Sequence, residues 1–138
     1  MEKVIVSGFT KLDIQSSWDA WTKPAHIIHW TFASDDWHCP HAQSDLKNEG
    51  RFLTRMEAKD GSMGFDFEGT FLRVNAPFLL EYRMDDGRIA EVVFESKPEG
   101  TLITESFDPE NIHPVDMQKA GWQSILDNFV LYTQGLIP

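Results

Sequence analysis

Two acidic residues, two histidines and the only cysteine of the chain lie close together in residues 32–42, FASDDWHCPHA. Thiolate, imidazole and carboxylate groups are the ligands of zinc, which needs three or four of them to converge on one ion. His38 and Cys39 are adjacent and would strain to reach one ion together, and Pro40 interrupts the spacing before His41. The sequence therefore predicts that this stretch binds no metal ion. The alternative is a metal site in which Asp35 or Asp36 adds an oxygen ligand to His38, Cys39 and His41.

The same stretch also offers a nucleophile. Cys39 could attack a substrate if a neighbouring histidine removed its proton, although a free cysteine is most often a small buried apolar residue. Pro40 and the Ser-Asp-Asp cluster at 34–36 disfavour a long regular element. We therefore predict a folded loop, in which the cluster hydrogen-bonds to backbone amides while Phe32 and Trp37 anchor the segment.

A further candidate acid lies in the sequence TLITESF. In an extended strand Glu105 shares one face with Ile103 and Phe107, so we expect it to point inward, in or near a cavity. Burial raises the pKa of a carboxyl unless a cation or donors compensate, and Arg83 and Arg88 are possible partners. We favour a structural or ligand-orienting role over a general acid or base, because no second catalytic group can be placed beside Glu105.

The remaining polar candidates are weaker. In the sequence GFDFEG, Asp66 and Glu68 lie opposite two phenylalanines, so an inward aromatic face leaves both acids in solvent. If the cavity were polar, the faces would reverse and Asp66 would become a second acid. His26 and His29 lie one turn apart on a predicted helix, where a histidine is most often a surface or satisfied residue; ligand contact is the alternative for His29.

Apolar periodicity and turn residues predict the elements that position these groups. Residues 3–10 form a first strand, Asp13 caps a short helix that runs to Trp21, and Pro24 begins a second short helix that runs to about Trp30. Five more strands follow over residues 51–58, 64–74, 78–84, 88–96 and 101–107, separated by turn signals that include Asp60-Gly61 and Asp86-Gly87. In the first of them, alternation puts Phe52, Thr54, Met56 and Ala58 on one face. Short turns between successive strands indicate an antiparallel meander.

The last segment predicts one long helix. Pro114 opens it and Gly135 closes it. Apolar residues recur at three- and four-residue intervals, at Trp122, Ile125, Leu126, Phe129 and Tyr132. This stripe must be buried, and the sheet is the only large surface available.

Composition limits the class of protein and its partners. A chain of 138 residues fits a single domain, 1–138, and 41% hydrophobic residues indicate a packed core. A net charge of −10 repels phosphate, so we expect no nucleic-acid partner. One cysteine excludes an internal disulfide.

The sequence shows no signal peptide and no apolar run of the ~20 residues that a membrane span needs. We expect a soluble, cytoplasmic protein without membrane insertion, as a monomer or homodimer.

The order of elements and several sequence stretches resemble a known family. The stretches are Ala20–Pro24 with Trp30, FASDDWHCP (32–40), Asp45-Leu46, Gly50–Phe52, Met56–Ser62, Gly64–Gly69, Asp85–Arg88 and Gly121–Leu126. They are similar to the helix-grip fold of the START-like (SRPBCC) superfamily and, within it, to the bacterial branch of the family named for the activator of heat-shock-protein ATPase. The resemblance implies an α+β fold: a curved antiparallel sheet of six or seven strands wrapped around the C-terminal helix, with two short helices after the first strand.

The resemblance also implies a cavity between the long helix and the sheet. We expect it to bind a small apolar or aromatic molecule without a cofactor. The alternatives are an enzyme that acts on a hydrophobic molecule by acid–base chemistry, of hydrolase or cyclase type, and a stress-related, co-chaperone-like protein interaction. The expected ligand-binding residues are Trp37, His38, Phe52, Met56, Phe65, Phe67, Phe94, Glu105, Phe107, Trp122, Ile125 and Phe129.

Overall fold

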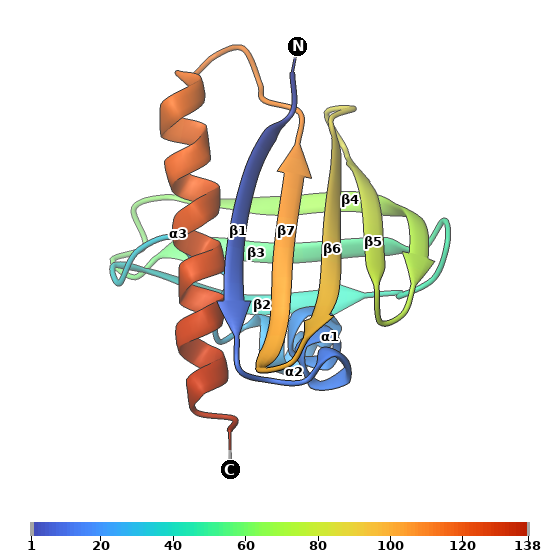
Figure 1. Ribbon diagram of the computed structural model, residues 1–138. Coiled ribbons are helices and arrows are strands. Elements are labelled where there is room, and N and C mark those ends of the chain that lie inside the picture. The colour runs from blue at the N-terminus through green and yellow to red at the C-terminus, as the bar shows by residue number, and fades with distance from the viewer. Residues whose placement is uncertain (1, 138) are drawn as a thin grey trace.

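A computed structural model describes residues 2–137 of the chain as one sheet, two short helices and one long helix (Figure 1). The helices are α1 (Ile14–Thr22), α2 (Pro24–Ile27) and α3 (Val115–Gln134). The strands are β1 (Val4–Thr10), β2 (Trp37–Ser44), β3 (Arg51–Ala58), β4 (Gly64–Asn75), β5 (Leu79–Met84), β6 (Ile89–Lys97) and β7 (Gly100–Phe107). The seven strands are all antiparallel, in the order β1-β7-β6-β5-β4-β3-β2.

The sheet is strongly curled. In Figure 1, β2, β3 and β4 run across the direction of β1, β7 and β6, so the two ends of the sheet face each other. Helix α3 packs against β1 on the open side, and α1 and α2 fill the lower end of the space. The predicted α+β helix-grip architecture, with its meander and its long C-terminal helix, is confirmed.

Local signals explain most of the element boundaries. Asp13 caps α1 by accepting a hydrogen bond from the backbone N–H of Ser16 at 3.4 Å. The predicted Asp-Gly turns hold, because Gly61 and Gly87 have φ values of +78° and +95°, which suit glycine. These turns set the register of the hairpins that follow.

The second helix is shorter than we predicted. Helix α2 ends at Ile27, and the chain continues through tight turns to Trp30. The Trp30 indole N–H donates to the carbonyl of Ala20 at 3.0 Å, which ties this segment to α1. Trp30 is therefore fixed by its side-chain hydrogen bond to α1 and is not part of α2.

The predicted loop at 32–42 is wrong in its second half. Residues Trp37–Ser44 form β2, which pairs with β3 at one edge of the sheet. Pro40 is tolerated because an edge strand does not need every N–H, and because the register shifts between His38 and His41.

The core lies between the concave face of the sheet and the three helices. Its fully buried side chains include Phe94, Ile103, Phe107, Leu126 and Phe129. Within residues 2–137, none of the helices combines the length and the apolar character that crossing a bilayer would require.

Candidate ligand-binding site

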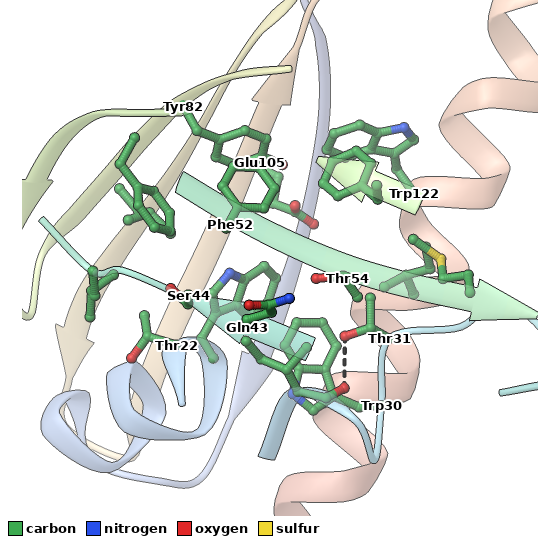
Figure 2. A pocket seen from close by; sticks show the side chains of 18 of the residues that line it. Thr22, Trp30, Thr31, Gln43, Ser44, Phe52, Thr54, Tyr82, Glu105 and Trp122 are labelled. Atoms are coloured by element: carbon green, nitrogen blue, oxygen red, sulfur yellow. Dashed lines mark hydrogen bonds between the residues drawn. The ribbon is translucent and has the colours of Figure 1, made fainter. Parts of the chain in front are cut away.

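The core contains a cavity of about 300 Å³ (Figure 2). It lies between the concave face of the sheet, α3 and the α1–α2 segment. Most of the side chains that line it are aromatic or aliphatic: Trp21, Ile27, Trp30, Leu46, Phe52, Met56, Phe65, Phe67, Phe71, Leu80, Tyr82, Trp122 and Ile125. The polar or charged lining residues are Thr22, Thr31, Gln43, Ser44, Thr54, Arg88 and Glu105.

The aromatic wall is built by contacts between rings from different strands. The ring centroids of Phe52 and Tyr82 are 5.1 Å apart, and those of Phe67 and Trp122 are 6.4 Å apart. Trp122 stacks on Phe107 at 3.9 Å with nearly parallel planes. Because each ring is held by its neighbours, the wall of the cavity is largely preformed.

Glu105 points into this cavity from β7, as predicted. It pairs in register with Val92 of β6, which pairs with Leu80 of β5, so the three side chains share the concave face. Glu105 is only 5% exposed. In Figure 2 its carboxyl group faces the open space, with Tyr82 and Phe52 on one side and Trp122 on the other.

The Glu105 carboxyl has no protein partner. Within residues 2–137 its side chain makes no hydrogen bond and no ion pair. Burial raises the pKa of the carboxyl from 4.5 to about 8, because no donor or cation stabilises the charged form. At neutral pH the carboxyl is therefore mostly protonated.

The two arginines that the sequence offers as possible partners do not pair with Glu105, although Arg88 also lines the cavity. Arg88 donates from Nε to Asp86 at 2.8 Å and from Nη1 to the carbonyl of Asp108 at 3.3 Å. Arg83 is exposed and alternates away from the inward-facing Tyr82 on β5. The proposed pairing with Glu105 is therefore wrong for both.

Hydroxyl groups that sequence reasoning missed also face the cavity. Ser44 Oγ is buried without a hydrogen-bond partner, and Thr54 points its hydroxyl toward the space in Figure 2. Burial, and then the proximity of Glu105, raises the pKa of Tyr82 well above its ordinary value. Strand alternation puts Thr54 on the same face as Phe52, although we did not count it among the ligand-binding residues, and in β5 it could have placed Tyr82 inward. Nothing in the sequence placed Ser44, because β2 was not predicted.

The structure divides the predicted ligand-binding residues into three groups. Those that line the cavity are Phe52, Met56, Phe65, Phe67, Glu105, Trp122 and Ile125. Phe94, Phe107 and Phe129 lie in the packed core, where Phe94 meets the ring of Trp18 and Phe129 that of Trp21. Trp37 lies in a neighbouring groove, and His38 Nε2 lies 3.9 Å from Glu57 Oε1.

The neighbouring groove continues the cavity toward the N-terminal half of α3. It has a volume of about 460 Å³. Five residues line both spaces: Met56, Phe65, Arg88, Trp122 and Ile125. These shared side chains form the boundary between the cavity and the groove, and the half-exposed Phe65 is one of them.

The Cys-His stretch is not arranged for chemistry. The Cys39 thiol is buried and donates a hydrogen bond to the carbonyl of His41 at 3.5 Å. Burial raises its pKa, which disfavours the thiolate that a nucleophile requires. Among residues 2–137, no group of three or more His, Cys, Asp or Glu side chains could hold a metal ion.

The other polar candidates lie outside the cavity. His26 Nδ1 is 2.6 Å from the Tyr132 hydroxyl, and His29 stacks on the same ring at 5.7 Å. Asp66 is on the outer face, where it accepts a hydrogen bond from Arg55 at 3.3 Å. Among the residues that the structure describes, Glu105 is therefore the one carboxyl that lines the cavity.

A curled antiparallel sheet that grips a long C-terminal helix around an apolar cavity defines the START-like class of proteins. The chain belongs to the family described as "Activator of Hsp90 ATPase homolog 1-like protein", whose sequence model matches residues 11–134.

Solved structures support this assignment. The chain is 47% identical to an AHSA1-like protein from Aeromonas hydrophila, with a TM-score of 0.93 over 98% of this chain and 94% of that one. It is 46% identical to a protein from Cytophaga hutchinsonii, with a TM-score of 0.83 over 97% and 93% of the two chains. A protein from Nitrosomonas europaea shares the fold at 16% identity and a TM-score of 0.83, over 97% and 95%. Among curated proteins, none matches the chain.

Proposed function

We propose that the protein binds a small apolar or aromatic molecule in the cavity between α3 and the sheet. The observation that carries this proposal is the lining: a preformed aromatic wall encloses about 300 Å³ and includes few polar groups. Ligand sites in proteins are typically concave, mostly apolar and provided with a small number of placed polar groups. The volume is at the lower end of the usual range, so a ligand of one or two rings fits best.

A binding measurement with a neutral aromatic compound tests this proposal. We expect 2-naphthalenemethanol to quench tryptophan fluorescence in a saturable manner, because Trp21, Trp30 and Trp122 line the cavity. Thr54→Phe should fill the cavity and weaken binding by about tenfold or more, because it removes the space for the rings. Thr104→Phe is the matched control, since Thr104 lies on β7 beside Glu105 but alternates to the outer face. Equal binding by wild type and Thr54→Phe would refute the cavity as the site.

A protein-interaction role is a second candidate. It is supported by the family description and by large apolar side chains exposed around the start of α3, namely Ile112, Val115 and Met117. An enzymatic role stays a hypothesis. Within residues 2–137, Tyr82 and Arg88 are the titratable groups that line the cavity with Glu105 and could act beside it in acid–base chemistry.

A further inference from the structure

Glu105 is a buried acid in a cavity whose lining is mostly, though not entirely, aromatic or aliphatic. A buried polar group is normally hydrogen-bonded, and a buried charge is normally paired. Glu105 has neither kind of partner among residues 2–137, although it is 5% exposed and aimed into open space. An unpartnered carboxyl in this position indicates that the missing partner comes from the ligand.

The surroundings of the carboxyl favour a cationic partner. In Figure 2, Phe52, Tyr82 and Trp122 lie around the Glu105 carboxyl, and aromatic faces attract cations through their negative quadrupole. The one cation of the lining, Arg88, is already held by Asp86 and by the carbonyl of Asp108. The net charge of −10 also attracts cations and repels anions over the whole surface.

Hydroxyl groups of the lining add hydrogen-bond acceptors for the donors of such a cation. A protonated primary amine offers three N–H donors, of which a carboxylate accepts one or two. Ser44 Oγ is buried without a partner, and the Thr54 hydroxyl also faces the cavity. Each hydroxyl oxygen can accept a hydrogen bond from a donor group of a molecule bound in the cavity.

We propose that the ligand of this cavity is an arylalkylamine, a primary amine on an alkyl carbon that carries aromatic rings; its ammonium group pairs with the Glu105 carboxylate while its rings occupy the apolar wall. This inference rests on the proposed function, because it specifies the chemistry of the molecule bound there. The only chemical change on binding is one acid dissociation: Glu105 releases its proton to solvent as the cation enters.

Three matched probes of the same size test the inference: 2-naphthylmethylamine as the cation, 2-naphthalenemethanol as the neutral compound and 2-naphthoate as the anion. We expect wild-type protein at pH 7.5 to bind the amine about ten- to a hundredfold more tightly than the alcohol, and the naphthoate most weakly. Glu105→Gln should bind amine and alcohol alike. Glu95→Gln, on the exposed part of β6, should behave as wild type.

The pH dependence gives a second readout. Between pH 6 and 8 we expect the affinity for the amine to rise by up to about tenfold per pH unit, because Glu105 must ionise before it pairs. Isothermal titration calorimetry in buffers of different ionisation enthalpy should detect close to one proton released. Besides Glu105, Tyr82 of β5 and Arg88 are the titratable groups of the lining. Tyr82 stays neutral in this range because its pKa is raised, and Arg88 stays charged.

The outcomes separate this inference from the proposed function. If the alcohol binds as tightly as the amine, or more tightly, and Glu105→Gln does not change the ratio, the amine preference is refuted while the apolar binding site stands. In that case the neutral Glu105 acid donates to an acceptor on the ligand, and affinity would fall as the pH rises through 8. If none of the three probes binds at millimolar concentration, both proposals are refuted.

Discussion

Replacing Glu105 by glutamine should change how the stability of the empty protein depends on pH. Glutamine keeps the size and the polar end of the side chain but cannot ionise. In wild type the buried carboxyl has its pKa raised from 4.5 to about 8. Between these two values the unfolded chain has lost a proton that the folded protein keeps. Stability from this group is therefore fully present below pH 4.5 and is lost as the pH rises through 8.

The size of this effect on the free energy of unfolding follows from the shift in the pKa of Glu105. Each pH unit between the two pKa values costs about 1.4 kcal/mol of unfolding free energy, so the whole interval corresponds to about 5 kcal/mol. From pH 5.5 to 7.5, wild type should lose about 3 kcal/mol more than Glu105→Gln. Other ionisable groups contribute equally to both proteins and cancel in the difference. Burial also raises the pKa of the Cys39 thiol, and this contribution is the same in both proteins.

Urea unfolding followed by tryptophan fluorescence at pH 5.5, 6.5 and 7.5 measures this difference. Glu95→Gln serves as the control, because Glu95 is exposed and should leave the wild-type pH dependence unchanged. Parallel curves for wild type and Glu105→Gln would refute the reasoning, since they would mean that the carboxyl is solvated or paired in the folded protein. A variant that unfolds at a similar urea concentration at pH 5.5 also provides a folded protein for the binding experiments.

Three further outcomes follow from the structure. The Cys39 thiol should react with an aromatic disulfide reagent at pH 8 more slowly than free cysteine, because it is buried and its pKa is raised; fast reaction would restore the nucleophile hypothesis. A strong chelator should leave the melting temperature unchanged, and a large decrease would reveal a structural metal near residues 32–42. Thr133→Val should lower the free energy of unfolding in urea by about 1–2 kcal/mol, because Thr133 Oγ1 and Thr10 Oγ1 form a buried hydrogen bond of 2.7 Å; no loss relative to Thr104→Val, on the outer face, would contradict this assignment.

The sequence by itself determined the repeating part of the fold and the direction of Glu105. Alternation of apolar and polar residues in residues 101–107 fixes which side chains share a face, because the pleat of a strand has a period of two. The same rule placed Phe52 and Thr54 on one face of β3, and the Asp-Gly turns marked the hairpins. These features depend on neighbours along the chain, so local sequence is sufficient to predict them.

Only the tertiary structure decided the second part of the stretch at 32–42. Proline normally ends a strand, and β2 survives because it is an edge strand with a shift in register at Pro40. Its position at the edge depends on pairing with β3, a separate strand that follows after a turn, so Trp37 meets Ala58. Without β2, the inward position of Ser44 could not be predicted.

The tertiary structure also decided what surrounds Glu105. Strand periodicity gives the face of a side chain but not its depth, so it could not separate Phe52 in the cavity wall from Phe94 in the solid core. Tyr82 and Trp122 reach the carboxyl from β5 and α3, and Arg88 turns to Asp86 instead. These relations arise from the curl of the sheet around α3, which brings together residues far apart in the chain and leaves one carboxyl in the cavity without a partner.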